Sequence, residues 1–324
     1  MSTVVVTEDV TGPAYDKLAA ARSLRRDAEA WSSPERLREL LAHAEAVIVR
    51  NRTQVDQAFL EAAPSLKVVA RAGVGLDNID LDAADRAGVV VVAPLGANAS
   101  SVAEHALAMA LALSKSLIPS STSTKAGGWD RTPTQELKGR TWGLLSAGAT
   151  ARATARLARS LGMDVVAYDP YIGPDHPEVL EIGLELAPLD DVLSRADVLS
   201  VHLPHTPATD RLLDAHRLAL LPRGALLISV GRGEVVDESA LLEALTTGRL
   251  GGAGLDVRAK EPPITGALET LPNVILTPHV AGISVQAQQR IGEILCDQIS
   301  TVLDGGQATC AVGRHVVPVR ETVA

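Results

Sequence analysis

The segment from Thr141 to Ala151, Thr-Trp-Gly-Leu-Leu-Ser-Ala-Gly-Ala-Thr-Ala, carries the strongest indication of the fold of this chain. Its first five residues form an apolar run of strand length, which predicts a buried strand leading into a turn and a helix. In a dinucleotide-binding unit such a strand is followed by Gly-x-Gly-x-x-Gly, whose glycines make the turn, admit a pyrophosphate and pack the helix on the strand. Here only the second glycine, Gly148, is present. The loop alone therefore does not establish a dinucleotide site.

Two residues of this loop depart from the motif. Ser146 takes the place of the first glycine, so a residue with a Cβ has to make the tight turn, at a cost that depends on whether its φ is positive. Thr150 stands at an inward position that is usually aliphatic, and we expect its hydroxyl to bond a backbone carbonyl of the preceding turn. Ala151 is a tolerated variant of the third glycine.

On both sides of this segment, strand-like runs alternate with helical stretches, which is typical of doubly wound α/β sheets. The predicted strands are Val4–Thr7, Ala46–Val49, Val68–Arg71, Val89–Val92, Thr141–Leu145, Val165–Tyr168, Val198–His202, Leu226–Val230, Gly252–Leu255 and Val274–Leu276. Helices are predicted at Pro34–His43, Ser101–Ser116 and Gln286–Leu303, and Ser120–Thr124 is interpreted as a small-polar loop.

The length of 324 residues favours two domains over one core. Ala93–Ser101, with its proline and glycine, is the predicted crossing point between them. We predict a first domain of residues 1–97 plus 285–324, to which the final helix returns, and a second domain of residues 98–284. The tail after Gly305 carries mixed signals and is not assigned to an element.

Asp169 is the second feature of the predicted nucleotide region. The second strand of this region ends in Tyr168-Asp169-Pro170, 21 residues after Gly148. This is close to the spacing at which an acidic residue accepts hydrogen bonds from the adenosine ribose hydroxyls. Because the carboxylate would repel a 2′-phosphate, it predicts NAD as the cofactor in preference to NADP.

Three polar motifs follow the ends of later strands: Ser229-Val-Gly-Arg232-Gly, Asp256-Val-Arg-Ala-Lys-Glu261-Pro-Pro and Thr277-Pro-His279-Val-Ala-Gly. Successive strand ends in a parallel sheet point the same way, so these motifs are expected to converge on one crevice. A guanidinium can hold a carboxylate by two hydrogen bonds, an imidazole can exchange a proton near neutral pH, and a neighbouring carboxylate keeps that imidazole charged. The set suits hydride transfer to a 2-keto acid.

Each residue of this set also has a simpler interpretation when it is taken alone. Glu261, before two prolines, is then a solvated loop charge. Arg232 satisfies a helix end, and His279 is a loop histidine bonded to backbone. It is the order of the three motifs, with these flanks, that favours an active site.

With its Arg-Gly after a strand, Asp-Val-x-x-x-Glu-Pro and Thr-Pro-His, the chain resembles the D-isomer-specific 2-hydroxyacid dehydrogenase family, in particular its short D-3-phosphoglycerate dehydrogenase-like members. The resemblance extends over essentially the whole chain. It implies an α/β protein of two doubly wound domains, a flavodoxin-like substrate (catalytic) domain and a Rossmann dinucleotide-binding domain. It also implies an NAD-dependent D-2-hydroxyacid dehydrogenase (EC 1.1.1.-), which moves a hydride between NAD(H) and a small 2-hydroxy or 2-keto acid.

The resemblance implies a role for each catalytic residue. Arg232 positions the substrate carboxylate and polarises its carbonyl group, His279 exchanges the proton, and Glu261 fixes the imidazole and raises its pKa. The implied cofactor-binding residues are Ser146, Gly148, Ala149, Thr150, Asp169, His202, Pro204, Val230 and Asp256.

The substrate side of the site is predicted from the first domain. Arg71-Ala-Gly-Val74-Gly75 is similar to the family's carboxylate loop, in which backbone amides at Val74 and Gly75 hold the acid. Arg50 and Arg71 match positions near a distal phosphate of the substrate. Two guanidiniums predict a second anionic group on the substrate, a phosphate, phosphonate or sulfonate. The alternative is that both arginines only cap strand ends in solvent.

Two further departures from the family bear on the preferred substrate. Arg258 replaces an aromatic residue that is more usual after Asp-Val, and we expect it to add a third positive charge near the site. Ser229 stands where asparagine is common. Neither change removes a catalytic group.

Composition excludes several other classes of protein. A net charge of −9 without a basic cluster, and 2% aromatic residues, argue against a nucleic-acid partner. The two cysteines, Cys296 and Cys310, have no metal-binding spacing and indicate a reducing compartment.

The start Thr3-Val-Val-Val-Thr7 is typical of a strand and not of a signal peptide, and no apolar run is long enough for a membrane span. We expect a cytoplasmic protein without a metal. The family further implies a homodimer in which Ser101–Ser116 packs across a two-fold axis.

Three functions stay open on the sequence alone. The first is the active dehydrogenase. The second is a non-catalytic or weakly active homologue whose NAD binding is impaired by the degenerate glycine motif. The third is a related oxidoreductase acting on formate or phosphite; formate enzymes of this superfamily have a glutamine in place of Glu261 and an asparagine-rich pocket, which this chain lacks.

Overall fold

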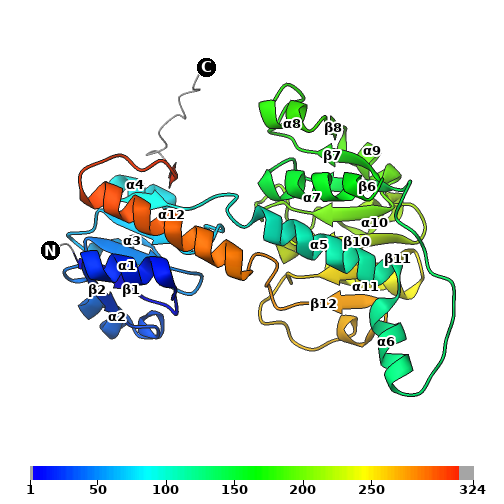
Figure 1. Ribbon diagram of the computed structural model, residues 1–324, viewed down its shortest axis with the longest axis horizontal. Coiled ribbons are helices and arrows are strands. Elements are labelled where there is room, and N and C mark those ends of the chain that lie inside the picture. The colour runs from blue at the N-terminus through cyan, green and yellow to red at the C-terminus, as the bar shows by residue number, and fades with distance from the viewer. Residues whose placement is uncertain (1–2, 314–324) are drawn as a thin grey trace. The chain divides into compact units, whose positions relative to one another are not determined.

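The computed structural model describes residues 3–313 and divides the chain into two compact units (Figure 1). The first unit comprises Met1–Asn98 and Ser284–Ala324, and the second comprises Ala99–Ile283. Of the domain predicted to end at residue 324, residues 314–324 lie outside the described part. The unassigned tail after Gly305 contributes a short strand at Ala311–Val312.

The first unit is built on a six-stranded sheet. Its strands are β1 (Thr3–Val6), β2 (Ser23–Arg26), β3 (Ala46–Val49), β4 (Val68–Arg71), β5 (Val90–Val92) and β13 (Ala311–Val312). The order is β13-β5-β4-β3-β1-β2, and all pairs are parallel except that of β13 with β5. The order 2-1-3-4-5 of the parallel strands is that of flavodoxin-like sheets.

Helices cover both faces of this sheet because its central strands are apolar on both sides. On one face, α1 (Pro13–Ala21) and α12 (Val285–Leu303) contribute Tyr15, Leu18, Ile291, Leu295 and Ile299 to the core. The other face is covered by η1 (Ala30–Ser32), α2 (Pro34–Leu41), α3 (Gln57–Glu61) and α4 (Leu81–Ala87). The last three helices are preceded by the N-cap residues Ser33, Asp56 and Asp80, whose side chains each accept from an amide of the first turn.

The second unit is built on a seven-stranded, fully parallel sheet. Its strands are β6 (Thr141–Leu145), β7 (Asp164–Tyr168), β8 (Glu185–Leu186), β9 (Val198–Val201), β10 (Ala225–Ser229), β11 (Leu250–Leu255) and β12 (Val274–Leu276). The order β12-β11-β10-β9-β6-β7-β8 reverses direction between β6 and β9, as in Rossmann sheets. The predicted α/β fold of two doubly wound domains is confirmed.

Two helix layers enclose this second sheet (Figure 1). One face packs against α5 (Ala99–Ser114) and α7 (Ala149–Ser160), and the opposite face packs against α9 (Leu189–Arg195), α10 (Ala215–Leu220) and α11 (Glu238–Thr246). The short elements α6 (Leu117–Lys125), α8 (Pro177–Glu181), η2 (Gly233–Val235) and η3 (Leu268–Thr270) lie in the connections.

One predicted loop is a helix. Ser120–Thr124 belongs to α6, which has no buried residue and follows Ser116 in the left-handed conformation, with φ 46°. Pro119 lies in the first turn of α6, where no intrahelical N–H bond is needed, so it does not break the helix. Within residues 3–313 no single helix has the length and apolar composition to cross a membrane; α5 and α6 meet that criterion only as a pair bent by 60°.

Glu8 fills the switch point of the first sheet, where the strand order reverses between β1 and β3. Its carboxylate follows β1 and accepts four backbone N–H bonds from the loop after β3, donated by residues 50–53 at 2.7, 3.1, 3.0 and 3.0 Å. Glu8 is only 4% exposed. Burial raises the pKa of Glu8, but the amide hydrogen bonds lower it by more, so the net pKa is below its usual range. The switch point of this unit is therefore occupied by the protein's own anion.

We predict that Glu8→Gln lowers the free energy of unfolding at pH 7 by roughly 3 kcal/mol, because the amide cannot satisfy four inward N–H groups. Urea unfolding checks this, with exposed Glu39→Gln on α2 as the control. The pKa of Glu8 is lower in the folded protein than in the unfolded chain. The stability that ionised Glu8 contributes is therefore present above the unfolded pKa and is lost as pH falls through the folded pKa. The difference between wild type and Glu8→Gln should therefore shrink in acid, and an equal stability at pH 7 would contradict the account.

Candidate active site

The buried carboxylate of Asp256 builds the turn that carries His279. Asp256 follows β11 directly and is 2% exposed. Its Oδ1 accepts from the Thr277 hydroxyl at 2.6 Å and the Val280 amide at 2.8 Å, and its Oδ2 accepts from the Ala281 amide at 2.8 Å. Its backbone carbonyl accepts from the His279 amide at 2.8 Å. These bonds hold His279 at a φ of 55°, which is unusual for a residue other than glycine.

His105 extends this network and was missed by sequence reasoning. It lies on α5, and its Nε2 is 3.0 Å from the Thr277 hydroxyl. Because that hydroxyl donates to Asp256, the histidine nitrogen is the donor to Thr277. The only signal in the sequence is a histidine on a helix that is rich in alanine and leucine. Asp256, predicted to bind cofactor, thus has both carboxylate oxygens engaged by the turn that carries His279.

His279 and Glu261 form a hydrogen-bonded acid–base pair. Nδ1 of His279 lies 2.7 Å from Oε2 of Glu261, and the two side chains are 47% and 37% exposed. The hydrogen bond to Glu261 raises the pKa of His279, and burial opposes it by less. Partial burial raises the pKa of Glu261, but the bonds from His279 and from the Arg258 amide lower it by more. Because Nδ1 is engaged, Nε2 is the ring nitrogen available for proton exchange with a ligand.

Arg232 belongs to the same cluster. It precedes η2, and its Nη1 donates to the Gly231 carbonyl at 2.9 Å. Its positive charge contributes a lowering of the pKa of both His279 and Glu261. The flanking glycines are required by close packing. A Cβ on Gly231 would lie 2.5 Å from the Leu203 carbonyl oxygen, and a Cβ on Gly233 would lie 2.0 Å from the Arg258 carbonyl carbon.

The loop after β6 is strained and internally bonded. Ser146 has a φ of 113°, where a side chain costs about 1–2 kcal/mol. Its hydroxyl accepts from the Gly148 amide at 2.9 Å and donates to Oδ2 of Asp169 at 3.4 Å. That same oxygen also accepts from the Ala147 amide at 2.8 Å.

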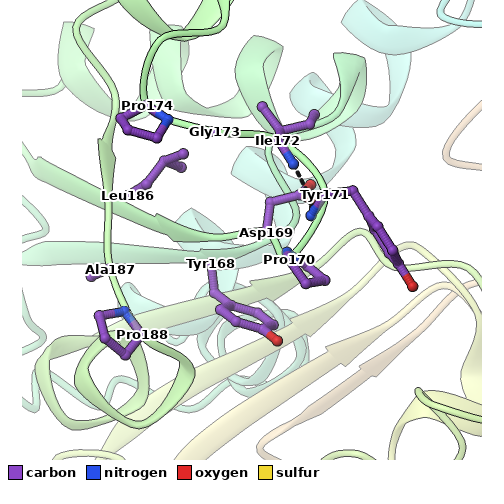
Figure 2. A pocket seen from close by; sticks show the side chains of 10 residues that line it. All are labelled: Tyr168, Asp169, Pro170, Tyr171, Ile172, Gly173, Pro174, Leu186, Ala187 and Pro188. Carbon is purple, nitrogen blue, oxygen red and sulfur yellow. Dashed lines mark hydrogen bonds between the residues drawn. The ribbon is translucent and has the colours of Figure 1, made fainter.

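Asp169 connects this loop to a cavity of about 450 Å³. Its Oδ1 accepts from the amides of Tyr171 and Ile172 at 2.9 and 3.1 Å, and Figure 2 shows the carboxylate turned toward them. The cavity is lined by Tyr168, Asp169, Pro170, Tyr171, Ile172, Gly173, Pro174, Leu186, Ala187 and Pro188. With four donors already present, the carboxylate must give up a contact, the longest being that to Ser146, before it accepts from a ligand hydroxyl.

Thr150 does not bond a backbone carbonyl of the preceding turn, and that expectation was wrong. Its hydroxyl lies 3.2 Å from Nδ1 of His202, whose Nε2 lies 2.9 Å from the Ser200 hydroxyl. The Trp142 Nε1–H donates to Ser200 at 2.8 Å, so the serine proton is the one directed to His202. Nδ1 of His202 then carries a proton and donates to Thr150. Burial lowers the pKa of His202 to about 3, so the ring is neutral at pH 7.

Arg152 is a second residue that sequence reasoning missed. It lies in the first turns of α7 and is 8% exposed. Its Nη1 donates to the Ala147 carbonyl at 2.6 Å, and its other terminal nitrogen pairs with Glu178 of α8. Because Glu178 pairs with its charge, Arg152 braces the loop that precedes the helix N-terminus and adds no free positive charge there.

The predicted substrate loops lie in the first unit. The backbone amide of Arg50 donates to the Glu8 carboxylate, and its carbonyl accepts from the Asn78 side-chain amide at 3.2 Å. Arg71 is 9% exposed, and its Nη1 donates to the Ala72 carbonyl at 3.0 Å. Gly73 leaves room for that guanidinium, because a Cβ there would lie 1.9 Å from Nη1. Val74 and Gly75 follow in the same half-buried loop.

Comparisons with known proteins agree with this geometry. Residues 107–281 match the NAD binding domain of the D-isomer specific 2-hydroxyacid dehydrogenases. The D-3-phosphoglycerate dehydrogenase of Mycobacterium tuberculosis is 40% identical over 317 residues, 97% of this chain and 56% of that protein.

The chain belongs to the D-isomer specific 2-hydroxyacid dehydrogenase family. Among solved structures, the TT0316 protein from Thermus thermophilus superposes with a TM-score of 0.86 at 32% identity, covering 96% of this chain and 99% of that one. The D-lactate dehydrogenase from Aquifex aeolicus, complexed with NAD and lactic acid, gives a TM-score of 0.81 at 28% identity over 94% of this chain and 96% of that one. The chain spans a little over half (56%) of the length of the Mycobacterium relative.

In this family member Arg258 does not add a free positive charge to the site. Its guanidinium is bonded to Glu238 and Glu269, so that expectation was wrong. Ser229 is 1% exposed, and its hydroxyl has no hydrogen-bond partner among the described residues. Arg232, Glu261, His279 and Asp256 are brought together within the second unit; Arg50, Arg71, Val74 and Gly75 lie in the first.

We predict that Glu261→Gln lowers the pKa of His279, because a neutral amide no longer stabilises the imidazolium. The ring resonances followed by NMR against pH measure this directly, with Glu243→Gln, an exposed change on α11, as the control. Since the folded pKa is raised, the stabilisation by this pair is present below the unfolded pKa and is lost as pH rises through the folded pKa. A titration that does not move would show that the two side chains are not coupled.

Proposed function

We propose that this chain is an NAD-dependent D-2-hydroxyacid dehydrogenase. The observation that carries the proposal is the His279–Glu261 pair, with Arg232 beside it, in a unit that matches the family's NAD binding domain. The unit's sheet is parallel, and these residues follow the carboxyl ends of its strands, where such sheets bind ligands. In this proposal residues 99–283 bind the dinucleotide, and the other unit contributes substrate contacts.

The residues present fit a dinucleotide. The cavity beside Asp169 at the end of β7 suits an adenosine, and the loop before α7, which Arg152 braces through the Ala147 carbonyl, suits the pyrophosphate. We assign Ser146, Gly148, Ala149, Thr150, Asp169, His202, Pro204 and Val230 to this site, with Asp256 beneath it as a support. When bound, NAD supplies or accepts the hydride. The Asp169 carboxylate opposes a 2′-phosphate and so favours NAD over NADP.

The proton and the substrate are handled by the chain's own side chains. Arg232 holds the carboxylate of the 2-keto acid and polarises its carbonyl group. As C2 receives a hydride, the carbonyl oxygen becomes an alkoxide and takes a proton from Nε2 of His279. Glu261 stabilises the imidazolium before this transfer, and the reverse reaction returns the proton to His279. One hydride and one proton thus convert the keto acid to the hydroxy acid.

The substrate is proposed to carry a second anionic group. Support comes from Arg50 and Arg71 at the carboxyl ends of β3 and β4, with the Val74 and Gly75 amides in the next loop. Relatives named D-3-phosphoglycerate dehydrogenase are consistent with a phosphate. The family resemblance also leads us to propose a homodimer formed through α5.

A second candidate function has its own observation. Ser146 is strained, and its hydroxyl occupies both the Gly148 amide and Asp169. These contacts compete with a nucleotide, so the chain is alternatively a weakly active or non-catalytic homologue with impaired NAD binding.

We predict that His279→Ala lowers kcat for keto-acid reduction about 10²–10⁴-fold, the usual size of a general acid–base contribution, and leaves NADH affinity nearly unchanged. NADH oxidation followed at 340 nm across a panel of 2-keto acids, with NADH titration by fluorescence, checks both parts. Exposed His216→Ala on α10 is the matched control. Near-native turnover by His279→Ala would remove this residue from the mechanism and overturn the proposed function's proton step.

The strained loop gives a prediction that separates the two candidates. Ser146→Gly should lower the NADH dissociation constant about tenfold, equal to 1.4 kcal/mol, by relieving strain and freeing the Gly148 amide and Asp169. Ser146→Ala removes the hydroxyl but keeps the Cβ, so it should tighten binding only by the part due to the hydroxyl contacts. If neither variant tightens binding under the same salt, the loop is a working variant and the second candidate loses its support. Thr150 is left unchanged because its removal would unpair His202.

A further inference from the structure

Arg258 forms the most completely bonded ion cluster near the proposed active site. Its Nε and Nη2 donate to the two oxygens of Glu238 at 2.9 Å each, and its Nη1 donates to Glu269 at 2.5 Å. The arginine side chain is 10% exposed, and the two glutamates are 28% and 18% exposed. Glu238 begins α11, Glu269 lies in η3, and Arg258 lies two residues after Asp256. One guanidinium therefore ties three separate segments together.

The backbone at Arg258 touches two parts of the catalytic cluster. Its amide donates to Oε1 of Glu261 at 3.0 Å, the oxygen that does not bind His279. Its carbonyl lies against Gly233, the residue after Arg232, so closely that a Cβ there would approach the carbonyl carbon to 2.0 Å. The next amide, that of Ala259, donates to Glu238 at 3.0 Å. The peptide at Arg258 thus sits between Arg232 and Glu261 and is fixed by the ion cluster.

Little else holds Glu261 in place. Residues 259–267 are all exposed, and the nearest buried side chains are Val257 before this segment and Leu268 after it. A segment without apolar burial depends on polar contacts for its conformation. Glu269 adds one more such contact by accepting from the Gly266 amide at 2.8 Å.

We propose that Arg258, together with Glu238 and Glu269, is a positioning device that holds the segment 258–261 so that Glu261 faces His279 and the turn of Arg232 keeps its place. The inference rests on the proposed function, in which Glu261 supports proton transfer by His279 and must therefore be held in place. Arg258 itself is a positioning residue, since its guanidinium is hydrogen-bonded to the two glutamates and touches no reacting group.

Loss of the guanidinium is more disruptive than loss of either glutamate. Two partly buried carboxylates would then face each other without a counter-charge. Their repulsion would move η3 and the start of α11 apart and loosen the segment that presents Glu261. The charged groups that act on His279 are Glu261, Arg232 and Asp256, and of these only Glu261 lies on the loosened segment. Loss of the cluster should therefore act on His279 through Glu261.

The test compares Arg258→Met and Arg258→Lys with a matched control, Arg195→Met. Arg195 likewise bonds two acids: two of its nitrogens donate to Glu185 at 2.6 and 2.9 Å, and one donates to Asp191 at 3.1 Å. Unlike Arg258, it lies at the end of α9, at the amino edge of the sheet.

We expect Arg258→Met to lower kcat about tenfold with the KM for NADH within about twofold of wild type, because a small displacement of a catalytic group is costly. The NMR titration of His279 should move to lower pH. Arg258→Lys should recover part of both, and Arg195→Met should change neither.

The inference is overturned if folded Arg258→Met keeps wild-type kcat and the wild-type His279 titration, or if Arg195→Met has the same effect. If Arg258→Met does not fold, Glu269→Gln is the substitute; it should show a smaller change in the same direction, and no change would overturn the inference. Failure of the proposed function gives a different result. Wild type would then turn over no 2-keto acid, while the His279 titration in Arg258→Met would still decide whether Arg258 positions Glu261.

Discussion

The bonds made by the buried carboxylate of Asp256 are the constraint on which the proposed active site depends. Three donors from the turn at 277–281 converge on its two oxygens, and its carbonyl holds the His279 amide. These contacts impose the left-handed backbone of His279 and thereby aim the ring at Glu261. A residue strained in this way persists only where its surroundings over-determine it, and such strain gathers at functional sites. The imidazole is therefore placed before any ligand arrives.

The switch points of the two sheets differ in what occupies them. In the second unit the strand order reverses between β6 and β9, where the Ser146 loop and His202 lie, one strand away from the cavity beside Asp169. In the first unit the equivalent place between β1 and β3 is filled by Glu8, bound by four amides. Because open α/β sheets bind ligands at such points, the nucleotide is assigned to the second unit. The substrate contacts that we propose for the first unit are side chains such as Arg50 and the loop after β4.

Much of the fold was predictable because buried parallel strands appear in the sequence as unbroken apolar runs. Ala46–Val49, Val68–Arg71, Thr141–Leu145 and Val274–Leu276 have the predicted bounds. The edge strand β2, Ser-Leu-Arg-Arg, has no such run and was missed, as was the two-residue β8. The Ser- and Thr-rich α6 carries no apolar stripe to reveal it.

The residues of the proposed site could be named from the sequence, but the contacts that support them could not. The motifs placed Arg232, Glu261 and His279 at strand ends, and the structure brings them into one cluster. The partners of Thr150 and Arg258 were not predictable, because His202 and Glu238 lie 52 and 20 residues away and no local pattern links them. Glu8 is the same case, since its loop begins 42 residues later.

The most direct test of the account is the fate of an isotopic label. NADH carrying deuterium at both C4 positions would be incubated with a 2-keto acid that bears a second anionic group, such as a phosphate, and the product would be examined by NMR. We predict that deuterium appears at C2 of the resulting hydroxy acid, with the D configuration at that carbon. Consumption of the keto acid without deuterium at C2, or no conversion of any 2-keto acid although NADH binds, would contradict it.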